Sequence, residues 1–128
     1  MAMLSIMKTI PKGRSKAEDI SRSLGIAEDE LNELQLVERL LDPYAGFSWS
    51  GNSLRTLIQA LNVRLERIGE DVEKSILNEV KQEALQDWML ALIEDRLSTN
   101  QSRRALLRLR EFAQLAETEQ CLLVFDGD

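Results

Sequence analysis

The sequence predicts an all-α fold, a compact bundle of about five helices, and two observations support that prediction. From residue 70 to residue 126 the chain contains neither glycine nor proline, the residues that most often end a helix. Aromatic residues make up only 5% of the chain, so aliphatic side chains must fill the core, which suits helices better than a sheet. Residues 1–14 are expected to form a basic N-terminal arm, and residues 15–128 a single helical domain.

The N-terminal half is expected to hold two short helices. Ser15 and Glu18 have the spacing of a capping box for the first helix, and Gly25 ends it. The second helix begins near residue 27 with three acidic residues in its first turn, where negative charge is favourable, and ends before Pro43.

Three longer helices are expected in the remainder of the chain. Residues 52–68 place apolar side chains at every third or fourth position, and Gly69 breaks the pattern. The next helices are expected over residues 71–97 and 102–117. The residues expected to be buried include Leu57, Leu61, Val80, Ala84 and Leu92.

Two segments fall outside this helical pattern. Residues 44–51 hold three aromatic residues, Tyr44, Phe47 and Trp49, together with two glycines, and these rings are expected to fill the space between helices. Residues 121–125 form a short apolar tail, which is either a short strand or a packed extended end.

The composition restricts the function more than it defines it. The chain has no histidine and one cysteine, Cys121, and no cluster of residues with the spacing of a metal site. No phosphate-binding loop or activated nucleophile is visible, so the protein is expected not to be an enzyme and to use no cofactor, metal or small-molecule substrate. The chain lacks a signal peptide and an apolar run long enough to cross a bilayer, so no membrane contact and a cytoplasmic location are expected.

Charge alternates in sign along the chain, in blocks that are mostly one helix long. The net charge of −6 argues against nucleic-acid binding, but two local basic segments are candidates for contacts with a phosphate backbone. Either the arginines of the last helix bind phosphate, or they pair with the acidic helix before it. The basic candidates are Lys8, Lys12, Arg14 and Lys16 in the arm and Arg103, Arg104, Arg108 and Arg110 in the last helix; the acidic partners are Glu79, Glu83, Asp87, Glu94 and Asp95.

The segment from residue 88 to residue 93 is apolar on every side of its expected helix. A helix of a small bundle buries one face, so this segment must contact something on a second side. That contact is either the chain's own aromatic loop and tail or another protein chain. The candidate protein-interface residues are Trp88, Met89, Leu90 and Ile93.

Residues 20–31 have the helix–glycine–helix rhythm of a helix-turn-helix motif. The second helix would begin with three acidic residues, which a phosphate backbone repels. A plain two-helix corner is therefore the favoured interpretation, with a small DNA-binding regulator as the alternative.

Residues 97–107 contain a Ser/Thr-x-Gln-x-Arg helix start followed by an apolar pair. This pattern resembles the small helical subunits of CRISPR effector complexes, which act in antiviral defence. The resemblance implies a non-catalytic, RNA-binding helical bundle that contacts the nucleic-acid backbone inside a larger assembly, and it assigns that contact to Arg103 and Arg104. The leading hypothesis is thus a non-catalytic subunit with protein partners. The alternative is a free-standing homodimeric adaptor or inhibitor that binds one protein.

Overall fold

The computed structural model describes residues 5–12, 20 and 22–127. Four helices contain 59% of the described residues, and a four-stranded antiparallel sheet contains 19%. The prediction of an all-α bundle of five helices was therefore wrong, because the sequence analysis missed the sheet.

The sheet joins the two ends of the chain. Its strands are β1 (Ser5–Pro11), β2 (Arg22–Ile26), β3 (Gly46–Trp49) and β4 (Cys121–Asp126), in the order β2-β1-β4-β3. All neighbours are antiparallel, and Met7 of β1 lies opposite Phe125 of β4. The expected basic arm is thus largely a central strand, and the apolar tail is its neighbour, which settles the open alternative for the tail in favour of a strand.

The burial of β1 explains why its pattern was not recognised. Successive side chains of a strand point to opposite faces, so Ser5, Met7 and Thr9 share the face toward the helices, and all three are buried. Ile6 lies on the other face and is exposed. Two polar residues therefore point inward and an isoleucine points outward, which reverses the alternation expected of a half-buried strand.

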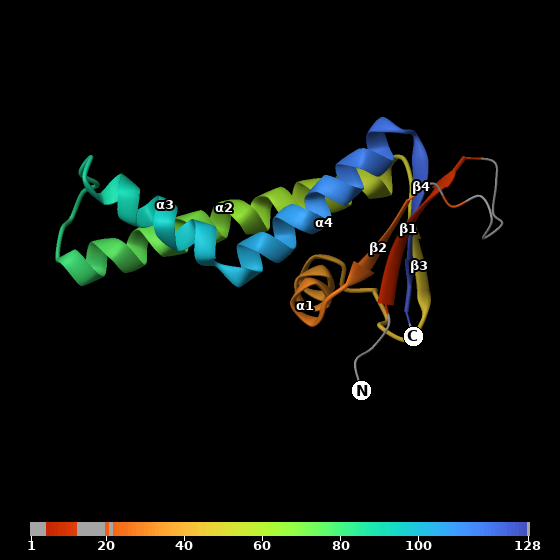
Figure 1. Cartoon of the computed structure of the whole chain (residues 1–128), viewed down its shortest axis with the longest axis horizontal. Coiled ribbons are helices and arrows are strands. Elements are labelled where there is room, and N and C mark those ends of the chain that lie inside the picture. Colours follow the sequence, from red (N-terminus) through yellow and green to blue (C-terminus); the bar gives the residue numbers. More distant parts are fainter. Residues whose placement is uncertain (1–4, 13–19, 21, 128) are drawn as a thin grey trace.

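The helices cover one face of the sheet and extend far beyond it (Figure 1). Helix α1 (Glu28–Val37) lies below α2 (Asn52–Val80), which is about 44 Å long. Helix α3 (Met89–Thr99) runs beside the distal half of α2, and α4 (Gln101–Thr118) returns beside the proximal half to the sheet. We call residues 69–100 the stalk and the other described residues the head.

The helix boundaries correct several expectations. Gly69 lies inside α2 and does not break it, and residues 81–88 form a turn region where a continuous helix was expected. Lys81 ends α2 with φ 56°, and Gln120 joins α4 to β4 with φ 55°. Both reversals use non-glycine residues in the left-handed region, so the absence of glycine did not indicate an unbroken helix.

Within the described residues neither the expected helix-turn-helix nor the two-helix corner is present, because β2 occupies residues 22–26, directly before α1. The expected capping box at Ser15 and Glu18 lies outside the described residues. A similar interaction occurs at α1 instead, where the Ala27 amide donates to the Glu30 carboxylate over 3.0 Å.

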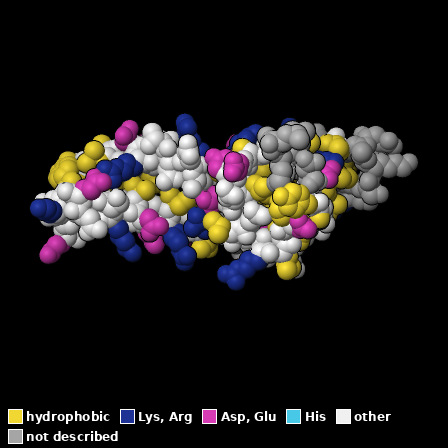
Figure 2. Space-filling view, turned by 90° about the horizontal axis from the view of Figure 1, so that it is seen from below, with side chains coloured by type: hydrophobic (Ala, Val, Ile, Leu, Met, Phe, Trp, Pro, Cys, Tyr) yellow, Lys and Arg dark blue, Asp and Glu magenta, His cyan; other side chains and the backbone are white. Residues whose placement is uncertain are grey.

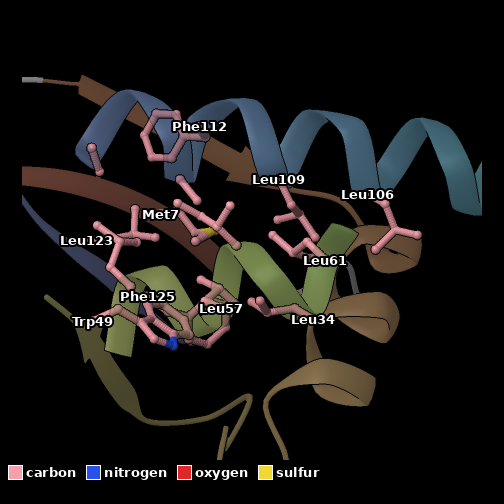
Figure 3. Close-up of a cluster of buried hydrophobic side chains, with 14 of the residues drawn as sticks. Met7, Leu34, Trp49, Leu57, Leu61, Leu106, Leu109, Phe112, Leu123 and Phe125 are labelled. Carbon is pink, nitrogen blue, oxygen red and sulfur yellow. The ribbon is translucent and has the colours of Figure 1, made fainter. Parts of the chain in front are cut away.

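The main core lies between the sheet and the helices (Figure 3). Leu57 and Leu61 are buried there as predicted, whereas Val80 is half-buried and Ala84 and Leu92 are exposed. Of the aromatic segment, Trp49 is buried on β3 and Tyr44 points into solvent. The largest fully buried side chains of this core include Met7, Leu34, Trp49, Leu61, Leu109, Leu123 and Phe125.

Candidate functional site

The distal end of the stalk has its own small core. Ile76 of α2 packs with Met89 and Ile93 of α3, and all three are buried. This cluster is separate from the main core and holds α3 against the distal half of α2. It is the only part of α3 that is fully covered among the described residues.

Four large apolar side chains surround this cluster and remain exposed. Leu85 is 43% exposed, Trp88 55%, Leu90 55% and Leu92 44%. We call these four residues the tip patch. In the space-filling view, hydrophobic side chains gather at the end of the molecule opposite the sheet (Figure 2).

Helix geometry places these side chains on both sides of the buried face. Residues four apart share a face, so Met89 and Ile93 point toward α2 together. Trp88 and Leu92 form an equivalent pair on one flank, and Leu90 lies on the opposite flank. The exposed apolar surface therefore borders the small core on both sides, instead of being scattered.

The structure divides the predicted protein-interface residues into two groups. Trp88 and Leu90 are exposed and available to a partner, whereas Met89 and Ile93 are buried within the stalk. The sequence analysis missed Leu85, and it expected Leu92 to be buried. The apolar run at residues 88–93 contains Leu92 but not Leu85, and the turn at residues 81–88 decides which of these side chains face solvent.

An ion pair links the two helices of the stalk. The guanidinium of Arg96 on α3 donates to the carboxylate of Glu79 on α2, and a second nitrogen lies 3.5 Å from the Ser75 hydroxyl. The hydrogen bond from Arg96 lowers the pKa of Glu79 and raises the pKa of the guanidinium. Both groups are exposed, so this pair orients the helices more than it stabilises them.

The acidic residues around the tip patch lack such partners. Between residues 81 and 95 there are four carboxylates and one lysine. No ion pair involves any of the four carboxylates within the described part of the chain. The carboxylates are Glu83, Asp87, Glu94 and Asp95, and all four are exposed.

The four arginines predicted to form one binding face have different environments. Arg108 donates to the buried carboxylate of Glu30 on α1 over 2.7 Å, and Arg110 donates to Asn62 on α2 over 3.0 Å. Neither pairs with the acidic helix that the sequence analysis named. Arg108 and Arg110 therefore connect α4 to the rest of the head.

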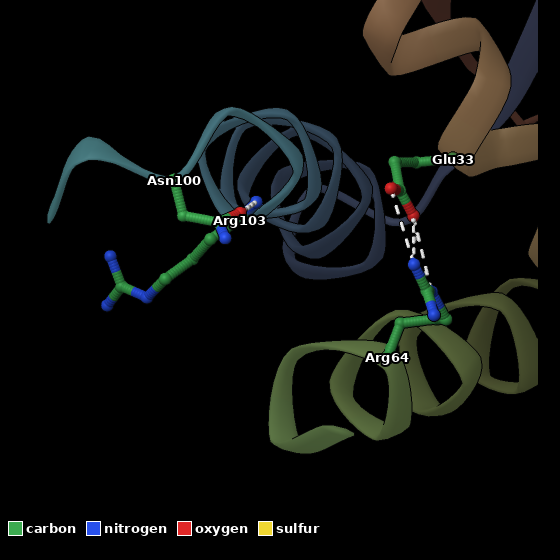
Figure 4. Close-up of polar contacts among 4 residues, drawn as sticks. All are labelled: Glu33, Arg64, Asn100 and Arg103. Carbon is green, nitrogen blue, oxygen red and sulfur yellow. Dashed lines mark hydrogen bonds and ion pairs between the residues drawn. The ribbon is translucent and has the colours of Figure 1, made fainter. Parts of the chain in front are cut away.

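Arg103 and Arg104 remain as the unpaired members of that group within the described residues. The backbone amide of Arg103 donates to the Asn100 side chain over 2.8 Å, which caps α4, and its guanidinium extends away from the helices (Figure 4). Arg104 is exposed. These two residues are also the ones to which the resemblance to CRISPR subunits assigned nucleic-acid contact.

Of the basic residues of the expected N-terminal arm, the structure describes Lys8 and Lys12. Lys8 lies on β1 and forms an ion pair with Asp126 over 2.8 Å. Lys12 is exposed at the end of β1, and Arg14 and Lys16 lie outside the described residues.

The described residues offer little reactive chemistry. They contain no group of three acidic, cysteine or histidine side chains that converges on a metal position. Cys121 is buried at the start of β4, where its thiol lies 3.6 Å from the Glu119 carbonyl. Within residues 5–12, 20 and 22–127, no helix has both the length and the apolar run needed to cross a bilayer.

No known protein family, curated protein sequence or solved structure matches this chain.

Proposed function

We propose that the protein is a non-catalytic binding subunit that contacts another protein chain through the tip patch. The observation that supports this proposal is the exposure of four large apolar side chains within eight residues, at the end of a stalk that projects away from the main core. Clustered apolar surface of this kind commonly marks protein interaction sites, and tryptophan is enriched at their centres.

Burial of the tip patch by a partner would be favourable, because it removes apolar surface from water. Removing a large apolar side chain from water is worth roughly 1.5–3 kcal/mol, and half of each side chain in the tip patch is still available to be buried. Met89 and Ile93 cannot contribute further, because they are already covered. Trp88 provides the largest contact area of the four and is expected to dominate binding.

A second group of exposed apolar residues lies on the head and competes with the tip patch as a binding surface. Leu36, Leu40 and Tyr44 are 60%, 81% and 70% exposed. These residues occupy the end of α1 and the following turns, not a projecting element. The experiment must therefore compare the two surfaces directly.

The test uses three purified variants as bait in extracts of the native cell. Trp88→Ser with Leu92→Ser removes the tip patch, Leu40→Ser with Tyr44→Ser removes the head surface, and Val63→Ser changes an isolated exposed residue on α2. Proteins captured by the wild-type chain should be lost with the tip variant and retained with the other two. Loss with the head variant alone would overturn the proposal.

Light scattering of the isolated chain separates a hetero-complex from the homodimeric alternative. A dimer that the tip variant converts to a monomer identifies a second copy as the partner. A monomer in both cases leaves the captured proteins as the partners. Circular dichroism must show equal helix content in all variants.

A second candidate function is contact with a nucleic-acid backbone inside such an assembly. The observation that favours it is the outward, unpaired position of Arg103 and Arg104 among the described residues. Two arginines on a chain of net charge −6 predict weak binding by the isolated protein. The helical-bundle fold implied by the resemblance to CRISPR subunits is absent, so this candidate depends on those residues alone.

Replacing Arg103 and Arg104 with alanine tests the second candidate in the assembled complex. If they contact phosphate, nucleic-acid affinity falls and its dependence on salt becomes shallower by about one log unit per lost contact. Arg67→Ala serves as the control, because Arg67 is an exposed arginine on a different helix, α2. Equal affinity for both variants would exclude this role for the pair.

A further inference from the structure

We infer that the partner of the tip patch is a basic amphipathic helix of another protein, which covers the tip patch with apolar residues and faces the surrounding carboxylates with lysine or arginine. This inference rests on the proposed function and names the chemistry of the partner. It is supported by the charge around the apolar residues and by the shape of α3.

The charge at the tip is one-sided. The four exposed carboxylates at residues 83, 87, 94 and 95 form no ion pair among the described residues, and no lysine or arginine lies between residues 83 and 95, with Lys81 just before them. Arg96, which follows, is already bound to Glu79. A partner with basic residues at its rim would neutralise this excess, whereas an acidic partner would be repelled.

The same charge argues against a second copy of this chain as the occupant. Two tips in a symmetric contact would bring eight carboxylates together, since the same surface meets itself. Opposing like charges across an interface is unfavourable. The tip is therefore better suited to a different chain than to its own copy.

The arrangement along α3 fits a helix. Trp88, Leu92, Asp95 and Thr99 follow spacings of four, three and four residues, so they form one exposed stripe. A second helix packed along this stripe would place its apolar residues against Trp88 and Leu92 and a basic residue near Asp95. Arginine is also attracted to the face of an exposed tryptophan.

Three synthetic helical peptides of equal length provide the probe. The first has a leucine stripe flanked by lysine and arginine, the second replaces those cations with glutamate, and the third keeps the cations but scrambles the leucines. Fluorescence anisotropy of labelled peptide measures the Kd. The first peptide should bind the wild-type chain at least tenfold more tightly than either of the others.

Quenching by acrylamide locates the bound peptide. The chain has two tryptophans, and Trp49 is 1% exposed while Trp88 is 55% exposed. The first peptide should therefore reduce quenching of the accessible fraction, which belongs to Trp88. No change in quenching at saturating peptide would place the peptide elsewhere and overturn the inference.

A charge-neutralised variant tests the rim. Asp87→Asn, Glu94→Gln and Asp95→Asn should weaken binding of the first peptide about tenfold, since the cations of the peptide lose the carboxylates that they face. The matched control is Glu66→Gln, Glu70→Gln and Glu111→Gln, which removes the same charge from exposed positions outside the tip. The control should bind as the wild type does.

The outcomes separate this inference from the proposed function. One outcome would support the interface and contradict the basic partner. In it, the captured proteins are lost with the double variant Trp88→Ser and Leu92→Ser but bind the charge-neutralised variant as tightly as the wild type at all salt concentrations. Equal binding of basic and acidic peptides, or binding of neither, also overturns the inference. A tip-dependent homodimer contradicts it while the interface itself stands.

Discussion

Arg64 and Glu33 form the best-defined buried ion pair among the described residues. Two guanidinium nitrogens of Arg64 on α2 donate to the Glu33 carboxylate of α1 over 3.0 and 3.2 Å (Figure 4). The Glu33 side chain is 7% exposed and the Arg64 side chain 28%. Because the carboxylate is almost fully removed from water, the hydrogen bonds from Arg64 offset the cost of burying it.

We predict that Arg64→Ala lowers the free energy of unfolding by about 3 kcal/mol, because it leaves a buried carboxylate without a cation. Arg67→Ala is the matched control, since Arg67 is exposed on the same helix and forms no ion pair among the described residues. It should change the stability by less than about 0.5 kcal/mol. Urea denaturation at pH 7 measures both values.

The mechanism has its own check. Glu33→Gln in the Arg64→Ala background removes the stranded charge and should recover a large part of the lost stability. If the two arginine variants are equally stable, or if the glutamine recovers nothing, burial of the carboxylate is not the cause of the loss.

These pairings show what individual residues reveal in a sequence. The acidic first turn of α1 was predicted from the helix dipole, and that turn contains Glu30. Its ion-pair partner Arg108 lies 78 residues away, and Arg64 lies 31 residues from Glu33. Side chains so distant in sequence are brought together by the packing of α1 against α2 and α4, which no local pattern encodes. For the same reason the sequence could not show that Arg108 pairs with Glu30.

At the scale of the elements, α2 is the longest helix and contains a glycine in its middle. Gly69 has ordinary helical surroundings, and a Cβ added there would meet no atom within 4 Å. Glycine costs roughly 0.5–1 kcal/mol in a helix interior, because the unfolded chain has more conformations to lose.

Gly69→Ala should therefore raise the free energy of unfolding of the stalk by about 0.5–1 kcal/mol. Gly51→Ala is the contrasting variant, because Gly51 begins the same helix with φ 52°, a conformation that strains any other residue. It should reduce stability. Thermal unfolding followed by circular dichroism compares them, and a loss of stability in Gly69→Ala would mean that the helix needs flexibility at this position.

The helical elements were the more predictable part of the fold. The apolar stripe over residues 54–68 was correctly assigned, and Leu54, Leu57, Ile58, Leu61 and Ile68 are buried. The strands could not be recognised in the same way. Strand β1 points two hydroxyl-bearing residues inward, and its partner β4 comes from the opposite end of the chain.

The whole molecule consists of two regions with unequal cores. The head buries most of its large side chains between the sheet and three helices, and both described ends of the chain are paired there in β1 and β4. The stalk has a core of only three buried residues among those described, Ile76, Met89 and Ile93, together with partly buried neighbours. Regions with few buried apolar contacts open more readily than the rest of a protein.

This division also explains which part of the candidate site was predictable. The sequence indicated that the apolar run at residues 88–93 contacts something on two sides, and the structure places its inner side on the stalk core. The identity of the outward side chains depends on where α2 ends, and that end is formed by Lys81 without any glycine signal. The sequence therefore could not separate the exposed Trp88 and Leu90 from the buried Met89 and Ile93, all four of which were named as interface residues, and Leu92 was assigned to the core.

We predict that Met89→Ala opens the stalk while leaving the head intact. Truncating a fully buried methionine costs roughly 2–5 kcal/mol, and the small core of the stalk has few residues with which to compensate.

Hydrogen exchange should show lost protection at amides of residues 73–97 and unchanged protection at Met7 and Leu123 in the sheet. Leu90→Ala, in the same helix but 55% exposed, should leave both regions protected. Equal loss in the sheet and the stalk would show that they unfold as one unit. If only the stalk opens, a partner that covers the tip patch must stabilise it, so binding should slow exchange at residues 73–97 more than anywhere in the head.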